Sequence, residues 1–523
     1  MGLGEIVGRS RQELTKRLER AGLPRTSRRA AAGVLTAAAS LDRSRFFVGA
    51  VSSTTPDLVR MSAREAAGQT VAMAEAAGRG RFDLLGYQAL SFGDPIDWHL
   101  DPVAGVRAPR VHWSRLPLQP AVIGDCKVVW ELNRHQWLVT LAQAYRLTGD
   151  ERHVAAFCRH VRDWLSANPP GHGVNWASSL EVALRLMSWC WALFLFRGAA
   201  TLPVALVMDI LTSIEAHATH VSRYLSHYFS PNTHLTGEAL GLVYAGLLFP
   251  ALPEARRWRE QGFGVLVQQS GRQVRPDGVY FEQSTCYQRY TVEIYLHALI
   301  LAARNGIPLP PSIAERTQAM LDFLLAVRCP DGSMPAIGDA DGGWLLPLAV
   351  RAADDCRGVF STAAAWFSRA DYAWAAGGEP APETLWLLGA TGLTAFSRLT
   401  PAPPAGAPSR LFEHGGYAVM RSGWAPGAHH LVLDAGPLGC PVSGGHGHAD
   451  LLSVQCAAFG RPSVVDPGTG CYTVEPEWRD FFRSTAAHST VMVDGVGQAE
   501  PAGPFGWRQR PAARVLRWIS TPE

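Results

Sequence analysis

Lysine is nearly absent from this chain, because only Lys16 and Lys127 occur among its 48 basic residues. The remaining basic residues are arginines, they form no basic block, and the net charge is only +3. This charge pattern gives no support to nucleic-acid binding. An arginine-rich cleft would instead suit carboxylate or sulfate groups, because the planar guanidinium binds them through two hydrogen bonds.

Long apolar runs, cysteine pairs and a secretory leader are also missing. No run approaches the ~18 apolar residues that a membrane span needs, and we expect no transmembrane helix. The nine cysteines include no C-x-x-C pair, so a disulfide scaffold is not expected. The first 31 residues have no apolar centre followed by a cleavage site, which predicts no signal peptide and leaves the compartment open.

The length of 523 residues, with 47% hydrophobic and 18% charged residues, predicts a globular chain with at least two cores. From about residue 125 to 388, apolar residues recur every three or four positions between short Gly- and Pro-containing turns. This periodicity predicts antiparallel α-helices.

The pattern changes after the proline-rich stretch 399–409. Short alternating runs separated by Gly-rich turns then predict antiparallel strands at 417–421, 430–434, 452–456, 463–466, 489–494 and 513–519. We therefore expect a helical domain over residues 1–395 and a β-domain over 396–523, which could be truncated.

The segment 444–450, GGHGHAD, is the most specific chemical motif. If it forms a strand, His446 and His448 share one face, since residues two apart point to the same side. Together with Asp466 and His488 they offer the ligand types that Zn²⁺ prefers. The alternative is that these histidines only form hydrogen bonds within a polar sheet.

A second motif, SPNTHLTGEA at 230–239, leads from a turn into an apolar helix. Asn232 supplies an amide and His234 a titratable ring, which suits a catalytic loop held by a rigid helix. The alternative is that Asn232 caps the helix and His234 is a surface residue.

A third motif lies at 277–291, where Tyr287 and Tyr290 flank Arg289 at the expected start of a helix. The neighbouring guanidinium would lower the pKa of the phenol and allow it to exchange protons with a sugar. Two tyrosines at this spacing are also common in helix cores.

Two further segments combine tryptophan with polar groups that can bind sugars. The candidate substrate-binding residues there are Trp130, Glu131, Arg134, Asn175 and Trp176. Their alternative is a structural one, with buried tryptophans and an intrahelical Glu131–Arg134 pair. Asp339 and Asp341 form either a carboxylate pair or a turn.

In this order, the segments resemble the heparinase II/III-like polysaccharide lyase superfamily, over roughly residues 98–507. The resemblance implies an incomplete (α/α) toroid, beginning at about residue 98, followed by an antiparallel β-sandwich. The motifs that carry it are DCKVVWELNRHQW, NWASSLEVALR, SPNTHLTGEALGL, DGVYFEQSTCYQRY and the run from GHGHADLLS to RSTAAHSTVMVDG.

The resemblance also implies β-elimination of an acidic polysaccharide such as heparin, heparan sulfate, alginate or a bacterial exopolysaccharide. Asn232 would neutralise the uronate carboxylate, and Tyr287 or a histidine would remove the C5 proton. Tyr287 would then protonate the leaving oxygen, while His234 and His446 would stabilise the developing charge. Glu282, Arg289 and Arg483 would join the substrate-binding residues.

The same resemblance implies a structural Zn²⁺ held by His448, Asp466 and His488, and an envelope location for many relatives. Two other functions remain open. One is a glycoside hydrolase that uses Glu131, Glu282, Asp339 or Asp341 as its acid and base. The other is a glycan-binding protein of exopolysaccharide metabolism without catalysis. The sequence indicates no oligomeric state.

Overall fold

The computed structural model describes residues 2–22 and 28–520 and divides into two compact units. Unit 1 comprises Met1–Leu266, Ile300–Ile307 and Leu345–Val350. Unit 2 comprises Val267–Leu299, Pro308–Trp344 and Arg351–Glu523.

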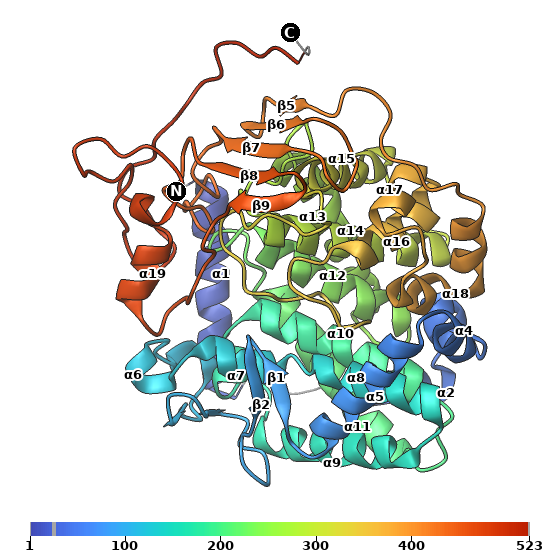
Figure 1. The fold of residues 1–523 in the computed structure, drawn as a ribbon. Coiled ribbons are helices and arrows are strands. Elements are labelled where there is room, and N and C mark those ends of the chain that lie inside the picture. The colour runs from blue at the N-terminus through green and yellow to red at the C-terminus, as the bar shows by residue number, and fades with distance from the viewer. Residues whose placement is uncertain (1, 23–27, 521–523) are drawn as a thin grey trace. The chain divides into compact units, whose positions relative to one another are not determined.

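Unit 1 is mainly helical, with two short hairpins (Figure 1). Its first helices are α1 (Leu3–Arg20), α2 (Arg28–Ser40), α3 (Val48–Val51), α4 (Thr55–Ser62) and α5 (Arg64–Gly78). The hairpins pair β1 (Phe82–Leu84) with β2 (Tyr87–Leu90), and β3 (Leu100–Asp101) with β4 (Val106–Arg107). The following helices are α6 (Pro120–Ile123), α7 (Cys126–Asn133), α8 (Gln136–Thr148), α9 (Glu151–Ala167), α10 (Ser179–Phe196), α11 (Val204–Arg223) and α12 (Thr233–Leu248). Helix α13 (Ala255–Gln273) begins in unit 1 and ends in unit 2.

Helix α10 forms the centre of unit 1, where it packs against α8, α11 and α12. Nearly all of its residues are buried, in keeping with a helix that is apolar on every side. Among the described residues it is the one helix whose length and hydropathy would suffice to cross a membrane, and the whole of that stretch is buried inside the structure.

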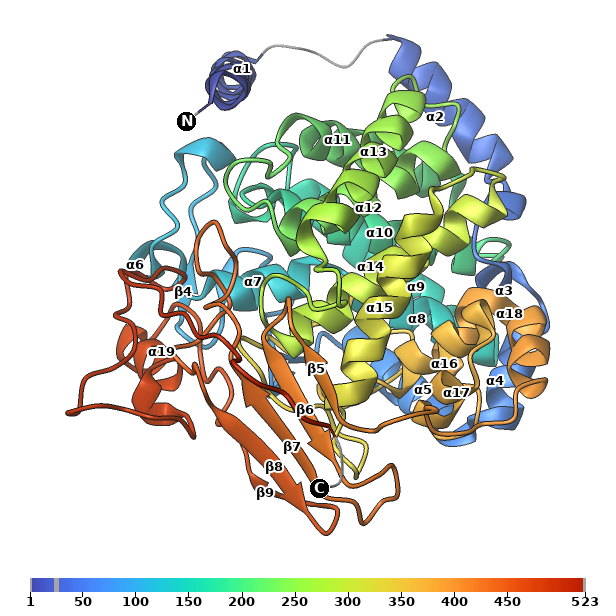
Figure 2. The same cartoon turned by 90° about the horizontal axis from the view of Figure 1, so that it is seen from above.

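Unit 2 combines helices with a five-stranded antiparallel sheet (Figure 2). Its helices are α14 (Thr285–Arg304, ending in unit 1), α15 (Pro311–Val327), α16 (Arg357–Phe367), α17 (Ala370–Ala375), α18 (Pro382–Ser397) and α19 (Pro476–Phe482). The strands β5 (Arg410–Phe412), β6 (Tyr417–Arg421), β7 (His430–Asp434), β8 (Val454–Ala458) and β9 (Arg461–Val464) pair in chain order.

The sheet buries one face against helix α15. Alternate residues of β7 are buried, as the two-residue period of a half-buried strand requires. The ring of Phe323 on α15 meets Phe412 of β5 and Tyr417 of β6 at centroid distances of 5.0 and 5.2 Å. These aromatic contacts tie the sheet to the helical part of unit 2.

The predicted strands at 417–421 and 430–434 are confirmed as β6 and β7, and those at 452–456 and 463–466 overlap β8 and β9. The strands predicted at 489–494 and 513–519 are wrong, since both segments are irregular. Their apolar side chains are exposed, with Val493 at 67% and Leu516 at 88%. Alternation alone makes no strand without a surface to bury one face. The predicted domain limit at 395/396 stays a prediction.

Candidate functional site

The buried carboxylate of Asp339 is the centre of a charged cluster in unit 2. Its two oxygens accept hydrogen bonds from His446 Nδ1 and His448 Nε2, both at 3.0 Å, and from both terminal nitrogens of Arg479. These cationic and N–H partners hold the pKa of Asp339 well below its usual range, although burial alone would raise it. Asp339 is therefore a fixed anion.

Close backbone packing places this carboxylate. Gly338 has a φ of +62°, and a Cβ there would lie 2.5 Å from the carbonyl oxygen of Gln283 and 2.6 Å from that of His446. The Asp339 backbone N–H also donates to the His446 carbonyl at 2.9 Å. Only glycine fits this backbone crossing.

His446 and His448 lie in a loop and not in the predicted strand, and His446 has a φ of +68°. The predicted shared strand face is therefore wrong, and both rings instead donate to one carboxylate, that of Asp339. A common chemical role for the two histidines stays a prediction.

Tyr287, in the first turn of α14, stacks on His446 with ring centroids 4.0 Å apart. Its hydroxyl lies 3.2 Å from the hydroxyl of Tyr472. Burial raises the pKa of Tyr287 well above its ordinary value, and the charges of Asp341 and Asp339 add to this. Tyr287 is thus a protonated phenol at neutral pH.

The expected lowering of the Tyr287 pKa by Arg289 is wrong. Arg289 is fully buried, pairs with Glu293 at 2.9 Å, donates to the carbonyl of Gly343, and stacks over Trp344 at 3.6 Å. Its charge is therefore turned toward partners other than the phenol.

Burial acts to lower the pKa of His446, but its hydrogen bond with Asp339 and the charge of Glu282 raise it above the ordinary value. Glu282 is fully buried, with its carboxylate 3.9 Å from His446 Nε2. His446 is consequently suited to carry positive charge beside the Tyr287 ring.

A group of potential metal ligands adjoins this cluster. One ligand atom from each of His448, Asp450 and His488 lies within 4.8 Å of the others. The ring nitrogens His448 Nδ1 and His488 Nε2 are buried and have no hydrogen-bond partner among residues 2–22 and 28–520. Burial and neighbouring carboxylates raise the pKa of Asp450 well above its usual range, and burial raises that of Asp434 to about 7. Unpaired buried nitrogens beside crowded carboxylates are what a cation would satisfy, so these residues fit a metal ion.

Asp466, predicted as a ligand, accepts a hydrogen bond from His488 Nδ1 at 2.6 Å. A carboxylate in this position either orients a histidine or moves onto the metal beside it. The choice of Asp466 as third ligand stays a prediction, and Asp450 is a second acidic residue in reach of both histidines.

Arg483 is fully buried in unit 2. It pairs with Asp480 and donates to the carbonyl oxygens of Gly503 and Gly506. The predicted contact of Arg483 with substrate is untested, and in this structure the guanidinium holds the segment after α19.

Unit 1 brings two predicted substrate residues, Glu131 and Arg134, to a second charged cluster that also contains Glu181. Arg134 donates to Glu131 at 2.6 Å and to Glu181 through two hydrogen bonds of 2.7 and 3.0 Å. Although burial raises it, the pKa of Glu181 is lowered overall by Arg134, with smaller contributions from Lys127 and His234. Helices α7 and α10 and the start of α12 therefore contribute to one charged region.

Trp130, Asn175 and Trp176 are engaged inside unit 1. Trp130 Nε1 donates to the carbonyl of Val174 at 3.0 Å. Asn175 donates to Trp98 and Asn168, and Trp176 is almost fully buried. Their roles in substrate binding stay predictions.

Asn232 caps helix α12, accepting a hydrogen bond from the His234 backbone N–H at 3.1 Å. The predicted cap at Asn232 is therefore confirmed, whereas His234 is half-buried and not the surface residue of that alternative. A catalytic role for Asn232 or His234 stays a prediction.

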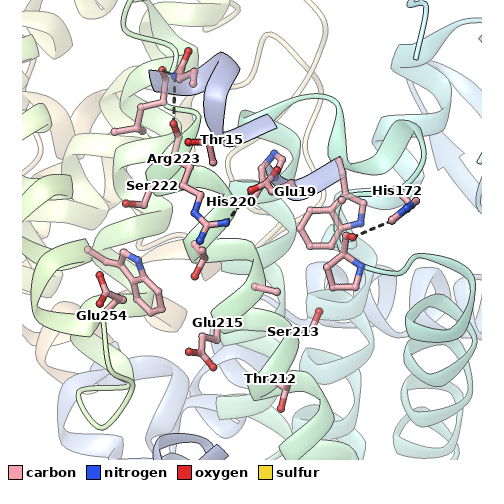
Figure 3. Close-up of a pocket in the computed structure, with 18 of the residues that line it drawn as sticks. Thr15, Glu19, His172, Thr212, Ser213, Glu215, His220, Ser222, Arg223 and Glu254 are labelled. Atoms are coloured by element: carbon pink, nitrogen blue, oxygen red, sulfur yellow. Dashed lines mark hydrogen bonds and ion pairs between the residues drawn. The ribbon is translucent and has the colours of Figure 1, made fainter. Parts of the chain in front are cut away.

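Unit 1 also contains a cavity of about 1300 Å³ between α1, α9, α11 and α13 (Figure 3). Glu19 on α1 and Arg223 on α11 point toward each other there and form a 2.8 Å ion pair (Figure 3). Four arginines and four acidic residues line the cavity. This balance gives no preference for a polyanion.

Sequence reasoning missed Arg479, Tyr472, Asp450 and Glu181. Arg479 and Tyr472 reach Asp339 and Tyr287 from more than 100 residues away in sequence. No local pattern marks such contacts, whereas Asp450 was visible as the last residue of the GGHGHAD motif.

The chain combines many helices with an antiparallel sheet near its C-terminus. Its candidate site combines a tyrosine, a histidine and a group of potential metal ligands. This is the class predicted from the sequence, a helical toroid followed by a β-sandwich. Two family profiles match the chain, "Heparinase II/III N-terminus" over residues 20–357 and "Heparinase II/III-like, C-terminal" over residues 404–519. The chain belongs to the heparinase II/III family.

Among curated relatives, the heparin-sulfate lyase of Pedobacter heparinus is 27% identical over 419 residues, covering 78% of this chain and 55% of that protein. The heparin-sulfate lyase of Bacteroides stercoris is 25% identical over 440 residues, covering 78% and 57%. The chain thus spans about half the length of the curated relatives it matches.

The solved structure of heparinase III has a TM-score of 0.64 at 20% identity, covering 83% of this chain and 64% of that one. The heparan sulfate lyase from Pedobacter heparinus gives 0.53 at 24%, covering 82% and 60%. These likenesses confirm the predicted fold class.

Proposed function

We propose that this chain is a polysaccharide lyase that cleaves a uronate-containing glycosaminoglycan of the heparin and heparan sulfate type by β-elimination. The observation that carries the proposal is the Tyr287–His446 pair, held against the fixed anion Asp339 and hydrogen-bonded to Tyr472. Family membership and the named activity of the curated relatives support it. Neither alginate nor a bacterial exopolysaccharide gains comparable support.

In the proposed reaction a base removes the C5 proton of the uronate, and the C4–O4 bond breaks to leave a C4–C5 double bond. Tyr287 supplies the proton to the departing O4, because a phenol with a raised pKa keeps its proton until the leaving group takes it. His446, with its raised pKa, supplies positive charge for the anionic intermediate.

With Tyr287 as the acid, the base is assigned to a histidine of the predicted set. Tyr472 is unsuited to this role, because burial and the charges of Asp339 and Asp341 raise the pKa of its phenol well above the ordinary value, although its hydroxyl hydrogen-bonds to Tyr287. His234 and Asn232, which the family resemblance places at the uronate, keep those roles as predictions.

A hydrolase using Asp339 as general acid is disfavoured, because a carboxylate whose pKa is held well below its usual range has no proton to donate at neutral pH. Glu131 is likewise paired with Arg134.

We propose Zn²⁺ as the metal, held by His448, His488 and Asp466 or Asp450. The ion would neutralise buried carboxylates and join the loop of His448 to the segment of His488. Its role would be structural, and proton transfer is left to Tyr287 and the histidine base.

The test is to mix the protein with heparin, heparan sulfate, alginate and an unsulfated glucuronate polymer and follow ultraviolet absorbance. An absorbing unsaturated product is expected from a sulfated or unsulfated glycosaminoglycan. New reducing ends without absorbance would instead identify a hydrolase, and neither signal would favour a glycan-binding protein.

A further inference from the structure

Unit 2 contains a pocket of about 530 Å³ whose residues take no part in the Asp339 cluster. Its walls come from the end of α15, from α17, from the proline-rich connection between α18 and β5, and from the β6–β7 turn. The residues that form it are Arg328, Pro330, Trp374, Pro403, Trp424 and Pro426.

Two half-buried indoles make a corner in this pocket. The rings of Trp374 and Trp424 lie 5.7 Å apart with their planes at 79°. Prolines flank them, so the walls are rigid and mostly apolar. Perpendicular indole faces of this kind present a stacking surface and a side wall for the C–H face of a sugar ring.

Arg328 adds one positive charge to this corner. Its guanidinium carbon lies 5.4 Å from the Trp374 ring centre, and its Nε donates to the Gly332 carbonyl at 3.2 Å. Within the described part of the chain, the guanidinium has no carboxylate at ion-pair distance. In the same unit, Arg351 and Arg369 each pair with two carboxylates.

Burial lowers the pKa of Arg328, which reflects the energetic cost of a half-buried charge without an ion-pair partner. None of the described residues that line the pocket is acidic, although the charges of Asp331 and Asp355 reach Arg328 from outside it. An anion brought by a ligand would therefore meet a guanidinium that no carboxylate pairs with inside the pocket.

We propose that this pocket is a second saccharide site, which binds one anionic sugar unit of a polysaccharide by stacking on Trp374 and Trp424 and pairing with Arg328. The inference rests on the proposed function for the identity of the polymer. The site would hold a long chain while another part of it is cleaved, and so it would lower KM for polymers without changing kcat for short oligosaccharides.

The experiment measures binding by affinity electrophoresis in gels that contain heparin, an unsulfated glucuronate polymer or neutral dextran. All proteins carry Tyr287→Phe so that substrate is not consumed. Trp374→Ala with Trp424→Ala should weaken binding of the acidic polymers about tenfold, and Arg328→Gln should weaken it by a smaller factor. Dextran should not bind at this pocket.

Phe459→Ala is the matched control, because it removes an exposed aromatic ring from the β8–β9 turn of the same unit. Weaker binding to heparin alone would identify the bound anion as sulfate. Weaker binding to both heparin and the unsulfated glucuronate polymer would identify it as carboxylate. Affinities equal to those of Phe459→Ala would overturn the site. Thermal unfolding shows whether the tryptophan variant is misfolded. If it is, the binding affinity of Arg328→Gln, which keeps both indoles, decides whether the pocket binds the polymer.

The two proposals can fail separately. If the parent protein forms no unsaturated product but the tryptophan variants still lose polymer binding, the pocket stands and the lyase function falls. For the kinetic arm the same pocket variants are made with Tyr287 intact. If elimination is observed and these variants keep the wild-type KM for polymers, while their Tyr287→Phe counterparts keep full affinity, the pocket falls and the lyase function stands.

Discussion

The two buried charged clusters differ in how completely their polar atoms are hydrogen-bonded within the protein. In unit 1, Arg134 faces the carboxylates of Glu131 and Glu181 through three hydrogen bonds. In unit 2, Asp339 likewise pairs with an arginine, but it also orients His446 and His448, and a ring nitrogen of His448 remains unpaired. Buried polar groups are normally satisfied, so an unpaired one beside a fixed anion marks where a ligand or a reaction belongs.

Replacing Tyr287 by phenylalanine gives the largest expected effect. The ring packing on His446 is kept and one hydroxyl is lost, so turnover should fall about 10²–10⁴-fold while stability changes little. Initial rates of unsaturated product and thermal unfolding test this together. Near-normal turnover would show that Tyr287 takes no part in the reaction. The unit 2 cluster would then no longer be distinguished from the unit 1 cluster by a catalytic role.

Asp339→Asn sharpens the comparison, because it leaves the buried Arg479 without its anion. We expect a loss of about 3–5 kcal/mol in the free energy of unfolding, with loss of bound metal, since His448 is no longer oriented. Glu181→Gln is the matched change in unit 1. It should also destabilise the protein, though less, because Arg134 keeps Glu131.

Urea unfolding and metal analysis of both variants separate the outcomes. Equal loss of metal in Glu181→Gln and Asp339→Asn would show that global loosening, and not His448 orientation, releases the ion.

Removing the metal should destabilise the chain by about 2.7 kcal/mol at a free metal concentration one hundred times Kd. His448→Ala should lower metal content and melting temperature together, whereas His429→Ala, at an exposed position, should change neither. Purified protein without stoichiometric metal would show that the unpaired nitrogens of His448 and His488 are not metal ligands.

The helical repeat and the strands β6 and β7 could be predicted because each has a periodic face that finds a partner. The segments 489–494 and 513–519 show the same alternation, yet their side chains remain exposed. Periodicity reports what a segment could bury, and tertiary structure decides whether a surface exists to receive it.

The residue types of the site could also be predicted, but not their arrangement. His446 and His448 meet through Asp339, 107 and 109 positions away, and Arg479 lies 140 positions beyond that carboxylate. The predicted direction of the Tyr287 pKa shift was wrong for the same reason. Adjacency to Arg289 in sequence suggested a guanidinium beside the phenol, whereas that guanidinium faces Glu293 and Trp344.

The last prediction concerns a buried acidic residue of unit 1. Glu238 on α12 is fully buried and accepts hydrogen bonds from Ser226 N–H and Oγ at 2.8 and 2.5 Å. Burial raises its pKa to about 8, so the folded state holds a proton that the unfolded state releases near pH 4.5. The stabilisation is complete below that pH and is lost as the pH rises toward 8, by at most about 1.4 kcal/mol per pH unit.

Glu238→Gln mimics the protonated acid, because its oxygen can accept from Ser226 N–H and its amide can donate to Oγ. The free energy of unfolding should then vary less between pH 5 and 8 than in the parent, and the variant should be the more stable at pH 8. Glu254→Gln, an exposed change, is the control. Parallel pH profiles for the parent and Glu238→Gln would mean that Glu238 is ionised in the folded protein, and unit 1 would then contain a buried anion stabilised by the two hydrogen bonds from Ser226.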